Sequence, residues 1–459
     1  MKLKLLYLLP FFCLLLAGCS DDDALMTVSQ NEFKEISYEG GVFDIEMNTN
    51  VEWTAVSQAD WCRVSKSEGV GSRTLSVEVE ANLGAARTAQ VVIEAQGEQH
   101  TITFSQQAIP DGQELKYKLP IVFHIIYADE NDPKQNIPAD EIYAMLDEVN
   151  KMYQNAGAET TVDLNMEFVP AEFDPQGNRL EEPGIDRVKW LTADLDPTDV
   201  MEDDTRKYVH FLWEPNDYVN ILVYRFSSSA SNILGISTFP YTTKSHPLEG
   251  TDVLEDMNIT LANLNYVRGV SINNSYMGNV EDAFTPFAPE NYKELITKQV
   301  SGSITLAHEL GHYFGLRHTF SEAQIGCLDT DFCEDTKSYD KSSYDMFVNQ
   351  TYQLMNYNAD YANKFDWESL FKRTTCQDEE FVSHNIMDYA YSYLDEFTAD
   401  QRLRVRHVLD YSPMIPGPKQ TRAYLSTKAV SDAPMDLPFS VSNCGPRGLI
   451  VTNNNVSSI

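Results

Sequence analysis

The motif that most constrains this chain is HELGHYFGLRH, which runs from His308 to His318 and uses three of the chain's nine histidines. In a helix, residues four apart lie on one face, so His308 and His312 can direct their imidazole nitrogens at one point. Glu309 lies one step further round, where its carboxylate can take a proton from a water on the metal. The pattern therefore predicts a helix that holds a metal, rather than an exposed helix with chance histidines.

The second half of the motif supplies a third ligand. Gly315 falls three residues after His312, where a glycine can reverse the chain with φ > 0 and bring His318 back to the metal. Three histidines and a water form the open tetrahedral zinc site of a catalytic centre, not the closed site of structural zinc. Because zinc lowers the pKa of its water toward about 7, we expect Glu309 to act as general base and acid on a nucleophilic water.

The N-terminal residues predict export and lipidation. Two lysines precede an apolar run from Leu5 to Ala17 that is too short to cross a bilayer comfortably. The sequence LAGC resembles a lipobox, in which the signal peptide, residues 1–18, is removed and Cys19 is acylated. In the tether, residues 19–26, Cys19 is followed by SDDD, which resembles the export signal of surface lipoproteins in Bacteroidota. We expect a lipoprotein of the outer membrane, exposed on the cell surface; ordinary signal cleavage with no role for Cys19 is the alternative.

Charge and cysteine content narrow the partners further. The chain has 69 acidic and 34 basic side chains, a formal charge of −35, which repels phosphate backbones and argues against nucleic acid as a partner. After the signal peptide and the lipidated cysteine, an odd number of cysteines remains, so not all can pair internally. They are Cys62, Cys327, Cys333, Cys376 and Cys444.

Residues 27–108 predict a separate all-β module. Short β-rich runs such as GGVFDIEM and RTAQVVIEA alternate with turn signals and lack a helical period, which is typical of a small antiparallel immunoglobulin-like sandwich. The segment resembles a BACON domain through GGVFDIEMNTNVEWTAVSQADWCRVSKSEG and the closing ITFSQQA. The resemblance implies either glycan binding or a spacer. Trp53 and Trp61 could stack on a sugar or belong to the core of the sandwich.

A linker, residues 109–118, leads to a unit of a different kind at residues 119–411. LPIVFHIIY predicts a buried strand, and the helical spacing in PADEIYAMLDEVNKMYQNAG predicts a helix packed on a sheet. Further strands before the histidine motif make this unit α/β with a mixed sheet and an active-site helix. Residues 412–459 have no sustained period, and both a cap strand and a loose tail stay open.

A methionine turn joins the zinc motif to a known clan. HNIMDYAYS follows about seventy residues after HELGHYFGLRH, and together they resemble the metzincin clan of zinc peptidases. The resemblance implies that Met387 forms an apolar floor under the zinc ligands. It also implies that Tyr389 reaches the metal or the transition-state oxyanion. His384 is a possible ligand by residue type, but three ligands are already assigned.

Segments flanking the motif resemble the pappalysin-like, or cytophagalysin, family within that clan. They are LPIVFHIIYADENDPKQNIPADEI, NILGISTFPY, GVSINNSYMG, TLAHELGHYFGLRHTF, GCLDTDFCEDT and NIMDYAYSYLDEFTADQRLRV. The family implies an upper subdomain with the sheet, a cleft over the zinc and a smaller lower subdomain. It also implies that NILGISTFP is an antiparallel edge strand whose unpaired amides hold an extended peptide by strand addition.

The loop DTDFCEDT after the third histidine is a candidate calcium site. Its oxygen ligands would be Asp329, Asp331, Asp335 and Thr336, a density that suits Ca²⁺ and that the family resemblance supports. The alternative is an acidic loop in an acidic protein.

Two further assignments depend on the resemblance. It implies a disulfide between Cys327 and Cys376, with Cys333 as the alternative partner. It also makes Asp410 a candidate for the base of the pocket that takes the residue after the cut, hence a preference for Arg or Lys there. The alternative is an aspartate without a partner at a helix C-terminus.

The sequence as a whole predicts a cell-surface zinc endopeptidase that hydrolyses extended protein substrates. The main alternative is a catalytically silent glycan-binding or adhesion lipoprotein in which zinc serves only stability. Glu309 favours the enzyme, because a purely structural zinc site has no need of it.

Overall fold

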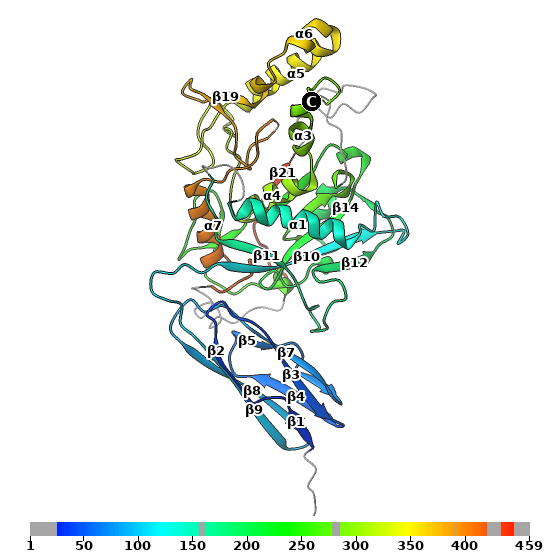
Figure 1. Ribbon diagram of the computed structural model, residues 1–459, viewed down its shortest axis with the longest axis vertical. Coiled ribbons are helices and arrows are strands. Elements are labelled where there is room, and N and C mark those ends of the chain that lie inside the picture. The colour runs from blue at the N-terminus through cyan, green and yellow to red at the C-terminus, as the bar shows by residue number, and fades with distance from the viewer. Residues whose placement is uncertain (1–24, 156–160, 278–284, 390, 420–432, 445–459) are drawn as a thin grey trace, which may run out of the picture.

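The computed structural model describes residues 25–155, 161–277, 285–389, 391–419 and 433–444. Figure 1 shows a β-sandwich at the lower end of the view and a larger α/β unit above it. The predicted signal peptide 1–18, the lipidation site Cys19 and all but the last two residues of the tether 19–26 lie outside the described residues. In the described part of the chain, no helix is both long and apolar enough to cross a bilayer.

The first unit is the predicted sandwich. One sheet has the strand order β1-β3-β7-β5 and the other β2-β9-β8-β4-β6. The strands are β1 (Met26–Val28), β2 (Glu32–Ile36), β3 (Gly41–Thr49), β4 (Glu52–Ser57), β5 (Cys62–Val64), β6 (Glu68–Val70), β7 (Arg73–Val79), β8 (Arg87–Ala95) and β9 (Glu98–Gln106). The pairings in this unit are antiparallel except that of β2 with β9, which is parallel, so the predicted antiparallel sandwich is confirmed with one parallel pair at an edge.

Alternating side chains close the core of the sandwich. Along β8 every second residue, from Ala89 to Ala95, is buried, as the period of two in a strand requires. Trp53 belongs to this core, with 2% of its surface exposed. Trp61 is half-buried and covered by the Arg87 guanidinium, 4.1 Å from its ring centroid. Trp53 is therefore a core residue, and Arg87 occupies a position over the Trp61 ring where a sugar would otherwise stack.

The second unit is built on a mixed sheet, as expected. The strand order is β11-β10-β14-β18-β15-β21, with β12 added beside β10 and β13 beside β14. The strands are β10 (Tyr117–Tyr127), β11 (Met166–Pro170), β12 (Ile185–Lys189), β13 (Asp194–Leu195), β14 (Val219–Phe226), β15 (Gly235–Thr238), β18 (Val270–Asn273) and β21 (Val441–Cys444). Strand β10 is parallel to β11 and β14, and β14 to β18, whereas β15 is antiparallel to both of its neighbours.

This unit begins slightly earlier than predicted. Strand β10 starts at Tyr117, inside the linker expected at residues 109–118. Leu115 and Tyr117 are both buried in the core of the second unit. The connector is therefore shorter than the sequence suggested, because its last residues already pack on the sheet.

Helices cover the sheet and carry the histidine motif across it. Helix α1 (Ala139–Tyr153) buries the apolar face predicted from its spacing, and α4 (Gly302–Tyr313) lies against α1, β15 and β18. The Tyr153 hydroxyl donates a hydrogen bond of 2.9 Å to the Ala307 carbonyl, which ties α1 to α4. The shorter elements here are α2 (Pro197–Glu202), η1 (Val209–Phe211), η2 (Ser228–Ala230), β16 (Tyr241–Thr243), β17 (Asp252–Leu254), η3 (Leu261–Asn263), η4 (Asn274–Tyr276) and α3 (Glu290–Lys298).

The remainder of the second unit follows the histidine motif. It contains α5 (Lys341–Tyr357), α6 (Ala359–Lys364), η5 (Trp367–Phe371), β19 (Lys372–Thr374), β20 (Glu380–Val382) and α7 (Ala399–Tyr411). Much of this region shares an aromatic core of its own, which includes Tyr339, Trp367 and Tyr391. In Figure 1, α5 and α6 extend at the end opposite the sandwich.

Ion pairs join the two units. Arg63 of the sandwich lies 2.5 Å from the Asp217 carboxylate of the second unit, and Lys118 lies 3.2 Å from Glu39. The Lys66 ammonium also donates a hydrogen bond of 2.5 Å to the Asn178 side chain. The sandwich is thus attached near the starts of strands β10 and β14 rather than near the histidine motif.

The C-terminal tail corrects one expectation. Of the tail predicted at residues 412–459, residues 441–444 form strand β21, which pairs with β15 from Thr238↔Val441 to Gly235↔Cys444. Strand β15 is antiparallel to β18, as the resemblance implied, but it does not lie at the edge of the sheet. The expectation of unpaired amides along NILGISTFP was therefore wrong, because a distant segment of the same chain pairs with them.

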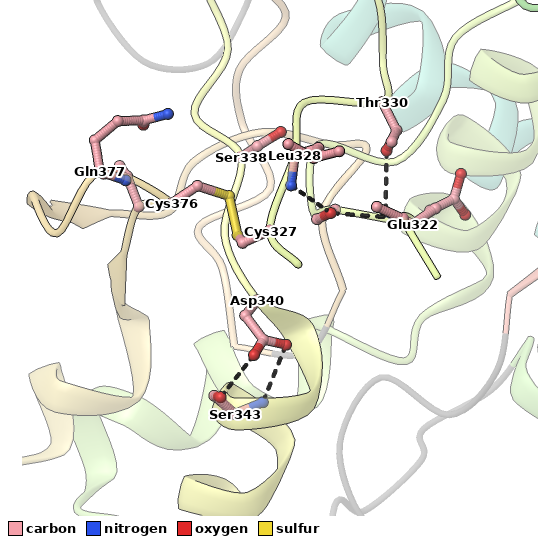
Figure 2. Close-up of a disulfide and its surroundings, with 12 residues drawn as sticks. Glu322, Cys327, Leu328, Thr330, Ser338, Asp340, Ser343, Cys376 and Gln377 are labelled. Carbon is pink, nitrogen blue, oxygen red and sulfur yellow. Dashed lines mark hydrogen bonds between the residues drawn. A yellow bond between two sulfur atoms is a disulfide. The ribbon is translucent and has the colours of Figure 1, made fainter. Parts of the chain in front are cut away.

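A disulfide closes the loop after the third histidine. Cys327 and Cys376 are joined, with their Cα atoms 5.3 Å apart, which confirms the predicted pair (Figure 2). Cys333, the alternative partner, is a buried free thiol. Within the same loop the Glu322 amide donates a hydrogen bond of 3.0 Å to the Thr330 hydroxyl, as Figure 2 shows. The disulfide therefore holds the loop that carries Glu322.

Removing this disulfide should destabilise the chain. It joins residues 49 apart, a loop for which the chain-entropy estimate is about 4 kcal/mol. We expect the double variant Cys327→Ser, Cys376→Ser to lose about 2–4 kcal/mol of unfolding free energy in urea titrations. Reducing agent should lower the unmodified chain to the same value and leave the variant unchanged. Equal stability of the oxidised chain and the variant would contradict this.

Candidate active site

The histidine helix ends in the turn that its glycine predicts. Helix α4 begins after Ser301, whose hydroxyl accepts a hydrogen bond from the Ile304 amide. Gly315 has φ +89°, and its amide donates to the His312 carbonyl while the Leu316 amide donates to the Gly311 carbonyl, both at 2.9 Å. This pair of bonds is the Schellman motif, in which the left-handed residue is usually glycine. The reversed chain then brings the third histidine back to the helix.

The three histidines converge, as predicted. His308, His312 and His318 are all buried, and one ligand nitrogen of each lies within 4.8 Å of the others. In the part of the chain that the structure describes, no other group of three His, Cys, Asp or Glu residues is arranged to hold a metal.

Each imidazole is oriented by a hydrogen bond from its Nδ1 atom. His308 donates to the Ile386 carbonyl at 2.8 Å, and His312 donates to the Leu316 carbonyl at 2.8 Å. His318 donates to the Glu322 carboxylate at 2.7 Å. An Nδ1–H that donates leaves the Nε2 lone pair for a metal, and such outer partners fix the tautomer and the ring.

This donor set fits zinc. Zn–N bonds of about 2.0–2.1 Å in a tetrahedron place the nitrogens about 3.3 Å apart, and the Nε2 atoms of His312 and His318 lie 3.1 Å apart. Three neutral imidazoles with oriented outer partners are typical of catalytic zinc, with one position left for water or substrate.

Glu322 is a residue that sequence analysis missed. Burial alone would raise the pKa of its carboxyl, but the hydrogen bond from His318 and the charge of nearby Arg317 hold the pKa below its usual value. The carboxylate is therefore ionised and suited to orient the third ligand. The only signal in the sequence was its position four residues after His318, which is common for unrelated glutamates.

Glu309 lies directly beneath strand β15. Its side chain is fully buried, one residue after the first ligand on α4. A Cβ atom built on Gly235 would lie 2.7 Å from Cγ of Glu309 and 3.0 Å from Cγ2 of Thr305. Because real Cβ atoms do not approach so closely, β15 can cross the helix at this distance only with glycine at position 235. In the sequence Gly235 stands within NILGISTFPY, where nothing marks its close approach to the helix.

The methionine turn packs against helix α4 and against the rings of the histidines. Met387 is fully buried, and a Cβ atom on Gly311 would lie 2.3 Å from its sulfur, so Met387 packs against α4 itself. The ring of Tyr389 lies 4.5 Å from that of His318 and 5.4 Å from that of His308, measured between centroids. Met387 and Tyr389 thus lie beside the histidine helix and its rings, and the roles that the family resemblance implies for them stay predictions. His384 instead pairs with Asp395 at 2.9 Å and does not join the metal group.

Arg373 supports the methionine turn and was also missed. Its side chain is fully buried and lies 3.5 Å from the Asp388 carboxylate, which is 1% exposed. The same guanidinium donates hydrogen bonds to the carbonyls of Tyr389 and Tyr391, at 3.3 and 3.0 Å. Asp388, the residue that follows Met387, is therefore held by a buried ion pair. In the sequence Arg373 is one arginine in a polar stretch, and nothing there marks its partner fifteen residues later.

The acidic loop gives no support to the predicted calcium site. Asp329 accepts a hydrogen bond from the Asp331 amide, Asp331 from the Cys333 amide and the Thr336 hydroxyl, and Asp335 from the Asp400 amide. The carboxylates thus cap turns and a helix rather than converge on one point. Burial and the neighbouring Asp329 carboxylate raise the pKa of Asp331 to about 7.

Asp410, near the C-terminus of α7, has a partner. Its carboxylate accepts a hydrogen bond from the hydroxyl of Tyr117, a buried residue of β10. The arginine of α7 beside this pair, Arg406, lies over the Tyr117 ring at 4.6 Å. The alternative of an aspartate without a partner was therefore wrong.

Comparisons with protein families agree with both resemblances. Residues 257–410 match the model of the M43 peptidase family, described as pregnancy-associated plasma protein-A. Residues 51–107 match the model of the BACON family, described as an N-terminal binding domain. The family assignments of the two units are thereby confirmed. No curated protein matches the chain.

Solved structures show weaker likenesses. Mature mirolysin of Tannerella forsythia, in complex with a cleaved peptide, is 22% identical over 65% of this chain and 93% of that one, with a TM-score of 0.42. A promirolysin mutant of the same organism is 21% identical over 65% of this chain and 81% of that one, also at 0.42. A protein of Bacteroides thetaiotaomicron is 20% identical over 20% of this chain and 97% of that one, at 0.16. At these scores the solved structures carry no weight for activity.

Proposed function

Because the second unit is a zinc metalloendopeptidase domain of the pappalysin family, we propose that the chain hydrolyses internal peptide bonds of extended protein substrates with Glu309 as general base and acid. The main support for this function is the position of Glu309, which is buried beside the three oriented histidines and under the backbone of β15. A zinc site that served only stability would not need an acidic side chain there. The purified chain should cleave casein or gelatin and lose this activity with a chelator.

The chemistry divides between the metal and the side chains. When bound by His308, His312 and His318, zinc supplies a Lewis acid that polarises the substrate carbonyl and acidifies water. Glu309 takes the proton of the attacking water and later delivers it to the leaving amine nitrogen. Burial keeps this carboxylate away from bulk solvent, so the proton passes between substrate and enzyme.

Tyr389 stabilises the oxyanion in this proposal. Its ring lies against those of His308 and His318 and is 8% exposed, and its hydroxyl would donate a hydrogen bond to the oxyanion that develops on the substrate carbonyl. A donor positioned where charge develops in the transition state is worth about 10²–10³ in rate. The ion pair of Arg373 and Asp388 holds the backbone on which Tyr389 is carried.

Replacing Gly235 should impair catalysis more than folding. The new Cβ of Gly235→Ala would press on Glu309 and Thr305, and a displacement of about 1 Å at a catalytic group can cost 10²-fold in rate. We expect kcat/KM to fall about 10–100-fold, with the zinc content unchanged. The control is Gly84→Ala, where the nearest contact of the new Cβ is 3.9 Å away. Full activity in Gly235→Ala would show that the glycine is not needed for the position of Glu309.

We also propose that the enzyme prefers Arg or Lys at the position after the cut. This preference would depend on Asp410. We expect Asp410→Asn to reduce this preference about tenfold or more, as the loss of one charged hydrogen-bonding partner does. Because Asp410 also accepts a bond from Tyr117, the control is Tyr117→Phe, which removes that bond and leaves the carboxylate. N-terminal mapping of peptide-library digests measures the preference. An unchanged preference with lower thermal stability would make Asp410 a structural partner of Tyr117 instead.

We also propose that the chain is a surface lipoprotein of the outer membrane, anchored at Cys19. The support is the sequence LAGC at the end of an apolar run, followed by SDDD. Cells fed a labelled fatty acid should label the protein, and Cys19→Ala should abolish the label. External protease should remove the unmodified protein from intact cells. Label retained in Cys19→Ala would contradict the anchor.

The rival function is adhesion through the sandwich module, with the metal unit silent. Its support is the match of residues 51–107 to a family described as a binding domain. The buried Trp53 and the covered Trp61 argue against an aromatic sugar platform. Binding on a glycan array without any proteolysis would favour this rival.

A further inference from the structure

We infer that residues 433–444, here called the docking segment, occupy the strand edge on which an extended substrate would bind, and so inhibit the enzyme from within its own chain. This rests on the proposed peptidase function. It concerns regulation of the same site and follows from how the segment is held.

Most of the docking segment is anchored by residues of the second unit that lie between β15 and β18 in sequence. The Asn263 and Asn265 side-chain amides donate to the carbonyls of Ala433 and Met435, at 3.0 and 2.9 Å. The Tyr241 hydroxyl donates to the Pro438 carbonyl at 2.7 Å. Leu437 is 7% exposed within the local apolar core. The segment is thus a built contact rather than a loose tail.

Two contacts hold the residues of the segment that directly precede β21. The rings of Tyr266 and Phe439 stack with their centroids 4.6 Å apart, and the Ser440 hydroxyl donates to the Asp252 carboxylate at 2.7 Å. The Phe239 amide donates a hydrogen bond of 3.1 Å to the Ser440 carbonyl, and the ladder between the two strands begins at this bond.

The ladder continues antiparallel toward the catalytic glutamate. The register pairs Ser237 with Ser442 and Gly235 with Cys444. Because hydrogen-bonded pairs alternate in an antiparallel ladder and the pair of Phe239 and Ser440 is bonded, Ser442 and Cys444 are the next residues bonded to β15. Gly235 is the residue that lies on Glu309, so the docking segment reaches the catalytic group.

An extended peptide would need the same backbone groups. Without β21, strand β15 would be the outermost strand after β18 in the described sheet, with one side of its amides and carbonyls exposed. Such an edge binds extended peptides by strand addition, and helix α4 with Glu309 contacts both β15 and β21. Two strands cannot share one ladder, so the docking segment and a substrate exclude each other.

The contact is intramolecular, which gives it an advantage over a free substrate. A segment tethered by a short connection acts at a roughly millimolar effective concentration. A substrate of ordinary affinity must therefore compete, and the apparent KM rises while kcat stays the same. Displacement or cleavage of the segment would then open the site.

The test uses three forms of the full zinc-loaded chain: unmodified, Ser442→Pro and Asn443→Pro. Proline at 442 removes an amide that bonds to β15, whereas proline at 443 removes one that faces away from it, a position where edge strands tolerate proline. We expect Ser442→Pro to raise kcat/KM on a peptide library about tenfold or more through a lower KM. We expect Asn443→Pro to match the unmodified chain.

A synthetic peptide of residues 433–444 completes the test. Added to Ser442→Pro, it should inhibit competitively and restore the higher apparent KM, and melting curves establish that each variant is folded. Equal cleavage by all three forms, or lower cleavage by folded Ser442→Pro, would overturn the inference while leaving the peptidase function standing. No cleavage by any zinc-loaded form would instead contradict the proposed function.

Discussion

Glu309→Gln is expected to abolish most proteolysis while leaving the fold and the metal site in place. Position 309 is fully buried beside the first ligand, and glutamine matches glutamate in size but cannot accept the proton of the attacking water. General acid–base catalysis contributes about 10²–10⁴ in rate, so we expect kcat/KM to fall by about that factor. Peptide-cleavage kinetics measure the loss, and metal analysis should find one zinc per chain in both forms.

The matched control is Glu334→Gln, which makes the same chemical change at an exposed position in the acidic loop. It should keep full activity and stability. Activity near that of the unmodified chain in a folded, zinc-bound Glu309→Gln would contradict the mechanism. In that case another group would have to move the proton.

Arg373→Met should cause the largest loss of stability. The guanidinium and the Asp388 carboxylate are both buried, at 0% and 1% exposure, and removing one partner of a buried pair leaves the other charge uncompensated, at a cost of about 3–5 kcal/mol. The substitution also removes the donors to the carbonyls of Tyr389 and Tyr391. We therefore expect a much lower urea midpoint together with reduced kcat, because Tyr389 is no longer held.

Two further variants separate the ion pair from general damage. Lys372→Met, at a neighbouring side chain that is 43% exposed, should change the unfolding free energy by less than about 0.5 kcal/mol. The double variant Arg373→Met, Asp388→Asn should be more stable than Arg373→Met alone, because no buried charge is left unpaired. A double variant less stable than Arg373→Met alone would contradict a direct pair between these residues.

The metal site could be predicted because its information is local. Helical spacing places His308 and His312 on one face, and the glycine three residues later can take the positive φ that returns His318. The strands of the sandwich were predictable for a similar reason, since β8 alternates between buried and exposed side chains along its length. In both cases neighbours in sequence are also neighbours in the site.

The parts that could not be predicted depend on distant partners. Strand β21 is four residues long, too short for any periodicity, and its place is set by contacts with residues near 240 and 265. Arg373 acquires its role only through Asp388. The calcium prediction followed the density of acidic residues and the family resemblance, and the aspartates of the loop accept hydrogen bonds from backbone amides that neither reveals.

N-terminal mapping of a peptide-library digest tests directly whether this chain cuts peptide bonds with a zinc held by His308, His312 and His318. The digest should be run with the zinc-loaded unmodified chain and with Ser442→Pro, each with and without chelator. We predict new internal N-termini in both digests, more of them with Ser442→Pro, lost on chelation and restored by zinc. If neither form yields new N-termini while zinc is bound and the fold is intact, the proposed peptidase function is contradicted.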